Sequence, residues 1–465
     1  MRRNATSGAP EAIARSVVAA CTDCEVCRSM MAAECHFFDE LYRLHDRAQT
    51  NGHAISSDDL RDLVDLCHYC TLCGCPDIRA DIIEAKTRFA ERDGLGMGPI
   101  LLEDVGRLGR TCGQFSRLAN WILANRHTAY PIKRFAGVHA DRLLPVFPET
   151  SFDSWARGRG LMQKPTPGPA DRVAYFAGCS GRYLFPEVPR ALVEILLHQG
   201  IHVYFPEQQC CGMPTLLEGD RKKTLAFMTA NVKRLAGLAA EGFTILCSCP
   251  TCGYVLKKLL KERAYYAETY QASIGAEKDV LMVPAEGRTT DDGKTLFQQF
   301  RKSIYGNILK DDGYFASIDP LQRIAVAENT LDAGEYLERL FPAPRDDNQS
   351  PEMLQRLVYF APCHQREQNI GRPYQDLLQK IPGIAVDVVD APYDCCGMGG
   401  IMGFKRGFHK RSTRLGAPVM AKMESYAPDA IVTDCLSCRL QFLHMADFSV
   451  LHPLEVISSR IGAKR

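Results

Sequence analysis

The sequence lacks the features that usually place a protein in a membrane or on nucleic acid. No apolar run approaches the roughly 18 residues that would span a bilayer. The 56 basic and 55 acidic residues give a net charge of +1, so no global field attracts nucleic acid or an anionic surface. Two arginines stand near the start, but the apolar run at 17–20 is too short for a secretory leader. We therefore expect a soluble cytoplasmic protein without nucleic-acid partners; a peripheral place on the inner face of the cytoplasmic membrane stays open.

Sequence motifs that bind common cofactors are missing as well. No dinucleotide-binding glycine pattern occurs, so we expect no bound flavin or nicotinamide. The glycine-rich stretch 397–403 is not followed by the lysine and threonine of a phosphate-binding loop. Its glycines are instead expected to pack around a metal cluster.

Cysteine, by contrast, is abundant, with 20 residues. In a reducing compartment, clustered thiols are more often metal ligands or redox groups than structural disulfides. Only Cys112 stands apart from every other cysteine, and we expect it to be a small buried residue. The cysteines that we expect to bind metal are Cys21, Cys24, Cys27, Cys35, Cys67, Cys70, Cys73, Cys75, Cys179, Cys210, Cys211, Cys249, Cys252, Cys363, Cys395, Cys396, Cys435 and Cys438.

From Cys179 onward, the order of cysteines repeats. The single cysteine, the adjacent pair before glycine and the closing Cys-x-x-Cys all recur after 184 to 186 residues. Short apolar runs at 173–176 and 357–360 lead into the first cysteine of each repeat. Each run is typical of a buried strand that delivers cysteines at its end.

Helical patterns, such as 186–200, lie between these runs. Strands that alternate with helices predict a parallel sheet with right-handed crossovers. Ligands of such sheets bind at the carboxyl ends of the strands, which is where the cysteines fall.

The predicted fold class is α/β, with an all-helical module in front of two repeated domains. The first module has long amphipathic stretches and no convincing strand, while proline and glycine mark the linker that follows. The connection between the repeats, at 261–353, mixes a helical pattern with polar loop. The predicted units are a helical module at 1–142, a linker at 143–171, a first repeat with its connecting segment at 172–353, and a second repeat at 354–465.

Two Cys-x-x-Cys-x-x-Cys runs, which begin at Cys21 and Cys67, indicate iron-sulfur clusters in the helical module. Three thiolates at this spacing wrap one corner of a [4Fe-4S] cube, and in two-cluster ferredoxins the fourth cysteine of each run serves the other cluster. Zinc is the alternative for paired cysteines, but a third cysteine at the same interval in both runs favours iron-sulfur. We therefore predict two [4Fe-4S] clusters, one held by Cys21, Cys24, Cys27 and Cys75 and one by Cys67, Cys70, Cys73 and Cys35.

Each repeat carries five cysteines, one more than a cubic cluster needs. Either one cysteine is spare or the cluster is not a cube. Adjacent side chains face opposite ways on a strand, so both thiols reach one core only on a tight turn. Gly212 and Gly397 follow the pairs and permit the positive φ of such a turn. The best candidates for redox chemistry are Cys210, Cys211, Cys395 and Cys396.

The two repeats resemble the twin CCG domains of an iron-sulfur oxidoreductase family. That family includes the B subunit of heterodisulfide reductase, the C subunit of anaerobic glycerol-3-phosphate dehydrogenase and the iron-sulfur subunits of glycolate and lactate oxidases. The most specific pieces are "DCCGMGGIMGF", "TDCLSC" and "VLHPLEVI", and residues 21–76 resemble the helical ferredoxin module that the family carries in front or as a separate chain. The resemblance implies one or two non-cubane four-iron clusters in the repeats, each contacted by both adjacent cysteines.

The resemblance also implies a function. Relatives are thought to pass electrons from a partner flavoprotein toward quinone, and heterodisulfide reductase splits a disulfide at its CCG clusters. We expect an iron-sulfur oxidoreductase, one component of a larger system, that carries electrons between a flavoprotein or other carrier and a quinone or a thiol/disulfide acceptor. Disulfide reduction at a non-cubane cluster is the second hypothesis, and a metal-bound scaffold without turnover is the third.

Two residues beside the expected ligands have ordinary structural interpretations. Cys247 precedes Cys249 by two residues, and Thr433 stands in its place in the second repeat, so we expect a small buried residue rather than a ligand. His364, next to Cys363, could protonate a substrate thiolate or tune a cluster. We expect it to be a hydrogen-bonded structural histidine.

Overall fold

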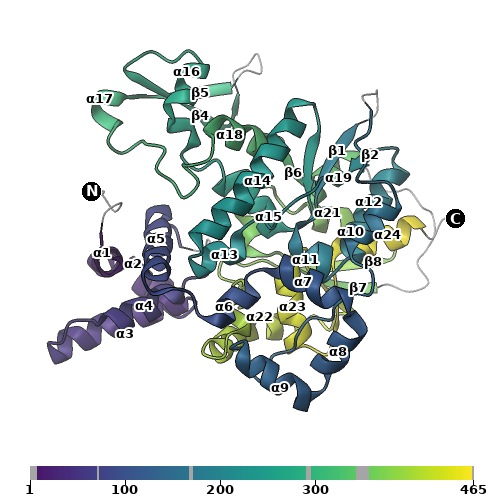
Figure 1. Ribbon diagram of the computed structural model, residues 1–465, viewed down its shortest axis with the longest axis horizontal. Coiled ribbons are helices and arrows are strands. Elements are labelled where there is room, and N and C mark those ends of the chain that lie inside the picture. Colours follow the sequence, from purple (N-terminus) through teal and green to yellow (C-terminus); the bar gives the residue numbers. More distant parts are fainter. Residues whose placement is uncertain (1–7, 71–72, 167–170, 290–294, 342–354, 463–465) are drawn as a thin grey trace.

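Two parallel four-stranded sheets form the body of the protein, and a group of N-terminal helices projects from it (Figure 1). The computed structural model describes residues 8–70, 73–166, 171–289, 295–341 and 355–462. Parallel sheets flanked by helices, behind a helical N-terminus, confirm the predicted α/β class.

The N-terminal helices enclose a small core of their own. Helix α1 begins at Pro10, a residue suited to the first helical position. Helix α4 begins with a capping box between Ser56 and Asp59. Phe37, Leu41 and other apolar residues of this core are buried against one another. The helices are α1 (Pro10–Cys24), α2 (Val26–Met30), α3 (His36–Asn51), α4 (Ser57–Asp65) and α5 (Pro76–Asp93).

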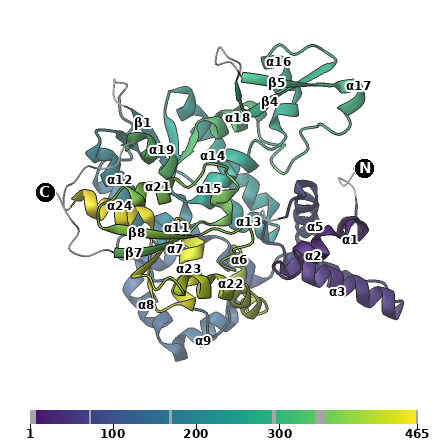
Figure 2. The same cartoon turned by 180° about the vertical axis from the view of Figure 1, so that it is seen from behind.

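Four further helices follow in the sequence, and the last two, α8 and α9, form the lower edge of the body in Figure 1 and again when the molecule is seen from behind (Figure 2). Gly109 lets this layer approach the first repeat, because a Cβ there would lie 2.3 Å from the Cβ of Tyr183. Val138, just after the last helix, forms a bridge with Lys405 of the second repeat. The helices are α6 (Met97–Leu102), α7 (Val105–Gln114), α8 (Ser116–Ala124) and α9 (Arg126–Phe135).

The first sheet has the order β2-β1-β3-β6, and its paired strands are all parallel. Its strands are β1 (Arg172–Phe176), β2 (His202–Tyr204), β3 (Thr244–Cys247) and β6 (Thr330–Asp332). Its helices are α11 (Gly178–Tyr183), α12 (Glu187–His198), α13 (Met213–Glu218), α14 (Arg221–Ala240), α15 (Pro250–Tyr254), α18 (Pro320–Glu328) and α19 (Ala333–Leu340).

The second sheet has the order β8-β7-β9-β10, so the sequence repeat is also a repeat of topology. Its strands are β7 (Gln355–Phe360), β8 (Ile384–Val389), β9 (Ala430–Val432) and β10 (Ser449–Leu451). Its helices are α20 (Cys363–Arg366), α21 (Pro373–Gln379), α22 (His409–Glu424), α23 (Leu436–Met445) and α24 (Pro453–Gly462).

The two sheets share one hydrophobic core. Tyr175 of β1 and Tyr359 of β7 are both fully buried in it, together with Leu246 and Ala430 from the central strands. The repeats are therefore packed against each other rather than strung apart, which brings the carboxyl ends of their strands close together.

The connection between the repeats differs from its sequence interpretation. Residues expected as polar loop form an antiparallel hairpin, and the stretch expected to be helical is interrupted by β6, which pairs with β3. A three-residue strand is too short to leave a periodicity in the sequence. The additional elements are α16 (Glu268–Ser273), β4 (Val280–Thr289), β5 (Thr295–Arg301) and α17 (Lys302–Tyr305).

The segment expected to be a linker contains ordered structure. Helix α10 (Phe152–Gly158) begins at a Ser151 cap. Phe152 is fully buried, in edge contact with Tyr175 and Phe205. Proline and glycine mark this segment as a linker, and the aromatic residues between them anchor it to the first sheet.

Candidate metal centres

The carboxyl ends of the central strands deliver cysteines, as predicted. Cys179 and Cys363 lie in the short helices that follow β1 and β7, and Cys249 and Cys435 stand at the N-caps of α15 and α23. Because parallel strands all end at the same edge, the cysteines of each repeat gather there.

The first five-cysteine set comprises Cys179, Cys210, Cys211, Cys249 and Cys252, all buried. The sulfurs of Cys179 and Cys210 lie 3.4 Å apart. The thiols of Cys210 and Cys252 hydrogen-bond to that of Cys211 and hold its pKa below the usual value. The set thus already contains one sulfur that favours the thiolate form, the form that binds metal.

The second five-cysteine set comprises Cys363, Cys395, Cys396, Cys435 and Cys438. Hydrogen bonding from the Cys438 thiol lowers the pKa of Cys435 to about 7. Burial raises the pKa of Cys363, and the nearby charges of Cys70, Cys396 and Cys435 raise it further. Cys70 belongs to the N-terminal module, so this set lies next to a cluster motif distant in sequence.

The adjacent cysteines lie on glycine turns, as the sequence predicts, and not on strands. Gly212 and Gly397 have φ of 81° and 80°, in the left-handed region. β2 ends at Tyr204 and β8 at Val389, well before either cysteine pair. The backbone N–H of Gly397 donates to the sulfur of Cys395 at 3.3 Å, as expected for a loop that stabilises thiolate.

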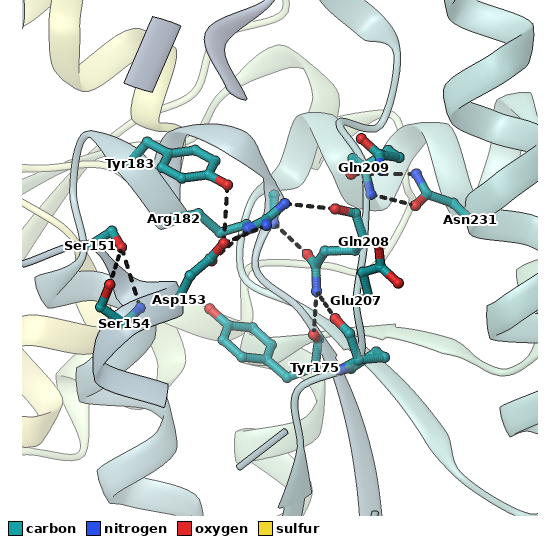
Figure 3. Close-up of polar contacts among 12 residues, drawn as sticks. Ser151, Asp153, Ser154, Tyr175, Arg182, Tyr183, Glu207, Gln208, Gln209 and Asn231 are labelled. Carbon is teal, nitrogen blue, oxygen red and sulfur yellow. Dashed lines mark hydrogen bonds and ion pairs between the residues drawn. The ribbon is translucent and has the colours of Figure 1, made fainter. Parts of the chain in front are cut away.

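Buried amides hold the loop in front of Cys210 (Figure 3). Gln208 accepts from the N–H of Gly178 at 3.2 Å and donates to the carbonyl of Tyr175 at 3.0 Å. Asn231 donates to the carbonyl of Cys210 at 3.0 Å and accepts from the N–H of Gln209 at 2.8 Å. These side chains tie the cysteine loop to β1 and α14.

Arg182 extends this network (Figure 3). Its guanidinium donates to the carbonyl of Gln208 at 2.7 Å and binds both carboxylate oxygens of Asp153, at 2.8 and 2.6 Å. Asp153 lies on α10, so the segment expected to be a linker helps to position the first five-cysteine set.

The outer set comprises Cys21, Cys24, Cys27 and Cys75. Burial raises the pKa of Cys21 to about 12, and the charges of Cys27, Cys75 and Cys24 act in the same direction. The four thiols therefore lie within interaction range of one another. Cys24 and Cys75 are exposed.

The inner set comprises Cys35, Cys67, Cys70 and Cys73, and all four line one narrow pocket. Burial raises the pKa of Cys73 to about 12, with further contributions from Cys67, Cys35 and Cys27. Cys27 belongs to the outer set, so the two sets are neighbours. The grouping of thiols is the one predicted from ferredoxin spacing; that each group binds a cluster stays a prediction.

Three parts of the chain meet at His364. Its Nε2 is 3.0 Å from the carbonyl of Tyr69, which lies between two inner-set cysteines, and its Nδ1 is 3.1 Å from Oγ1 of Thr251. Its ring stacks on Tyr254 with centroids 4.9 Å apart. Both ring nitrogens are engaged, as expected for a structural histidine. Thr251 in turn lies 4.0 Å from the sulfur of Cys435, so the two five-cysteine sets approach each other here.

The remaining two cysteines occupy different surroundings. Cys112 packs against the core of the sheets, away from the four sets. Cys247 is fully buried at the end of β3, with its sulfur 3.5 Å from the carbonyl of Cys249 and close to the thiol of Cys252. It borders the first five-cysteine set without a counterpart in the second.

Sequence reasoning missed the buried cations beside these sets. Arg142 is fully buried, contacts Met398 Sδ at 3.2 Å and lies near Cys396. Lys86 donates to the carbonyl of Cys67 at 3.1 Å and to that of Leu217 at 2.9 Å. Neither residue lies in a cysteine motif, so only the rare burial of a lysine or arginine identifies them.

The donor chemistry of the four sets fits iron-sulfur clusters. Within the described residues, no three Cys, His, Asp or Glu side chains are arranged to hold a single metal ion. The thiols gather in groups of four and five, mostly buried, with backbone donors and cations nearby. Thiolates in groups of four are the ligands of iron-sulfur clusters, and such surroundings tune their potentials.

Comparisons with known proteins agree with this chemistry. The family described as CCG, cysteine-rich domain, matches residues 173–257 and 357–443, one match in each repeat. Over 82% of both chains, the protein is 22% identical to a protein named as the C subunit of anaerobic glycerol-3-phosphate dehydrogenase, from Escherichia coli K12.

Two archaeal relatives match shorter regions. One is named as the B subunit of fumarate reductase (CoM/CoB), from Methanothermobacter marburgensis, and is 24% identical over 64% of this chain and 48% of its own length. The other, named an uncharacterized iron-sulfur protein, from Methanocaldococcus jannaschii, is 22% identical over 57% of this chain and 40% of its own length. The relatives are thus subunits of oxidoreductases or iron-sulfur proteins.

Proposed function

We propose that this chain, which carries the CCG cysteine-rich domain twice, is an electron-transfer subunit of an oxidoreductase complex. It holds two [4Fe-4S] clusters in the helical module at 1–142 and one or two non-cubane clusters in the repeats at 172–353 and 354–465, with 143–171 joining them. Electrons pass between a partner flavoprotein or other carrier and a quinone or thiol/disulfide acceptor. Iron-sulfur clusters supply one-electron transfer when bound.

The observation that carries this proposal is the continuous row of thiol sets. The outer set reaches the surface at Cys24 and Cys75. Its Cys27 lies near Cys35 and Cys73 of the inner set. The inner Cys70 then lies near Cys363 of the second five-cysteine set. An exposed end and a buried interior are what a carrier needs in order to accept electrons from a partner and pass them inward.

The chain's own residues support such a row by excluding water and supplying positive charge. The inner and five-cysteine sets lie among buried apolar side chains, and Arg142, Arg182 and Lys86 bring guanidinium or ammonium groups close to them. Positive charge near a cluster stabilises its reduced, more negative form.

Reoxidation of the reduced protein by an electron acceptor tests this function. We expect the chemically reduced, cluster-loaded protein to be reoxidised by a water-soluble quinone analogue, with the visible absorbance of the clusters returning in step with quinone reduction. Cluster-loaded Cys24→Ser should accept electrons from a partner flavoprotein more slowly, because Cys24 belongs to the exposed set. Reduced protein that reacts with neither quinones nor disulfides would contradict an electron-transfer role.

A second candidate function is the reduction of a disulfide at the second five-cysteine set. Cys363 is less buried than the other four cysteines of the set, so a substrate would approach the set from its side. A disulfide would take two electrons from the carrier and two protons from solvent to give two thiols. Turnover with a disulfide and none with quinones would favour this candidate; zinc binding without redox activity would leave only a scaffold.

We also propose that the protein docks peripherally on an anionic membrane. No helix in the described part of the chain is long and apolar enough to cross a bilayer. Between Val105 and Ala140, however, the sequence has no acidic residue, and the basic residues there are Arg107, Arg110, Arg117, Arg126, Lys133 and Arg134. The surface helices that carry these charges also expose large apolar residues, namely Phe115, Leu118, Trp121, Tyr130, Ile132 and Phe135.

Exposed aromatic residues among basic ones are typical of an interfacial surface, because the rings enter the headgroup region while the charges bind anionic lipid. Asn120 on α8 makes two 2.8 Å hydrogen bonds with the backbone of Phe147, which places the exposed Val146 beside this surface. A neighbouring pocket is lined by Lys133, Arg134 and Arg406. α8 and α9 form the lower edge of the molecule in both views (Figures 1 and 2).

Vesicle sedimentation tests the membrane surface. The protein should bind phosphatidylglycerol vesicles and not phosphatidylcholine vesicles, and salt should weaken the binding. The double variant Leu118→Glu/Trp121→Glu should bind about tenfold or more weakly, because it removes apolar contact and adds negative charge. Leu321→Glu, at an exposed apolar position on α18, is the control and should bind normally. Equal binding by all three proteins, or none to anionic vesicles, would overturn this assignment.

A further inference from the structure

Arg79 is a buried arginine with unused hydrogen-bond donors. It lies in the first turn of α5, four residues after Cys75, and is 7% exposed. Its Nε and Nη1 have no hydrogen-bond partner in the described part of the chain. An unsatisfied buried donor is costly, and more so when it is charged, so a partner for these groups is expected.

These donors lie at the inner set. Arg79 lines the same pocket as Cys35, Cys67, Cys70 and Cys73. Burial raises the pKa of Cys67 and of Cys73, and the Arg79 charge opposes that rise at both thiols. The guanidinium is therefore close to at least two cysteines of the set.

Other contacts fix the far side of the guanidinium. Nη2 lies 3.5 Å from the carboxylate of Glu367 in the second repeat, and the ring of Tyr69 lies 5.4 Å from Cζ. Lys86, the other buried cation near this set, directs its ammonium at backbone carbonyls instead. Arg79 is thus held in place while keeping two N–H groups for a ligand of the pocket.

We propose that Nε and Nη1 of Arg79 donate hydrogen bonds to sulfur atoms of the iron-sulfur cluster held by the inner set, and that Arg79 thereby raises the reduction potential of this cluster. The inference rests on the proposed function, because it requires a cluster in the inner set. On reduction the cluster sulfurs gain negative charge, so N–H donors and a positive charge stabilise the reduced form more than the oxidised form. Arg79 acts as a positioning and tuning residue and transfers no electron itself.

The test is a redox titration of the cluster-loaded protein followed by electron paramagnetic resonance. In Arg79→Met, the equilibrium constant for reduction of the inner cluster should fall at least tenfold, which corresponds to about 59 mV for one electron. Arg79→Lys, which keeps the charge but loses the fork of donors, should give a smaller fall. The outer cluster should keep its potential in both variants, and Cys24→Ser identifies its signal.

A matched control lies on the same helix. Arg88→Met removes an arginine of α5 that binds Glu84 in the same helix, and it should leave the inner cluster's potential unchanged. A second readout separates hydrogen bonding from simple charge. Exchangeable-proton couplings to the inner cluster, measured by electron-nuclear double resonance in H₂O and D₂O, should be reduced in both Arg79 variants and retained in the control.

The outcomes distinguish this inference from the function on which it rests. Wild-type protein without a cluster in the inner set contradicts the proposed function. An inner cluster whose potential and proton couplings are the same in Arg79→Met as in the wild type overturns the role of Arg79. If Arg79→Met fails to retain the cluster, Arg79→Lys provides the test instead, because unchanged proton couplings in that variant would also overturn the proposal.

Discussion

Replacing Cys396 by serine is expected to abolish the cluster of the second repeat while the N-terminal clusters persist. Cys396 lies on a glycine turn, buried beside Cys438 and near Cys363. A serine hydroxyl is a poor substitute for a thiolate ligand. Iron should fall by about four atoms per chain, and the spectroscopic signals of the cubic clusters should remain.

The matched variants make this result specific. Cys211→Ser should remove the cluster of the first repeat in the same way, and Cys395→Ser should disturb the same cluster as Cys396→Ser if both members of the pair bind iron. Cys112→Ser is the control, since Cys112 packs against the core and away from the four sets. Full iron content in Cys396→Ser would contradict the assignment of this residue as a ligand.

Replacing Gly397 by alanine is expected to destabilise the second repeat strongly. A Cβ at this position would lie 2.1 Å from the carbonyl oxygen of Ser412 and 3.0 Å from the backbone nitrogen of Gly416, both in α22. Backbone atoms of a helix yield little. The residue also has φ of 80°, which costs an L-amino acid about 1–2 kcal/mol. With overpacking of about 1–3 kcal/mol, the loss of unfolding free energy should reach about 3 kcal/mol or more.

Urea unfolding of the cluster-loaded protein measures this effect, with two comparisons built into the chain. Gly407→Ala should be nearly neutral, because Gly407 has open space around it. Gly212→Ala should cost less than Gly397→Ala. It shares the positive φ, but the nearest atom to a new Cβ is a methyl group of Thr224 at 3.2 Å. A midpoint for Gly397→Ala equal to that of Gly407→Ala would refute the packing argument.

Much of the site was predictable because it is encoded locally. The repeated cysteine spacing predicted two like sheets, and Gly212 and Gly397 predicted turns at the adjacent pairs, as observed. The ferredoxin spacing predicted the same grouping of thiols that the structure brings together. In each case the feature is encoded by a few neighbouring residues or by the repeated order of the cysteines.

The other features of the fold and site depend on tertiary contacts that no local sequence pattern predicts. β6 and β10 have three residues each, too few for a periodicity, and β6 joins its sheet only by pairing with β3. Cys70 and Cys363 interact across 293 residues of sequence. In the sequence Arg79 is one of several charged residues of an amphipathic stretch, and its burial beside the inner set follows from how the module docks on the repeats. Tertiary packing, rather than propensity, decides such positions.

Iron and acid-labile sulfide analysis of the anaerobically reconstituted full chain, with zinc measured in the same sample, tests the central claim most directly. The account predicts about eight iron atoms from the two cubic clusters and about four more for each loaded repeat, with sulfide in equal amount and no stoichiometric zinc. Stoichiometric zinc without sulfide would contradict it, since thiolate zinc sites carry no inorganic sulfur and no redox chemistry.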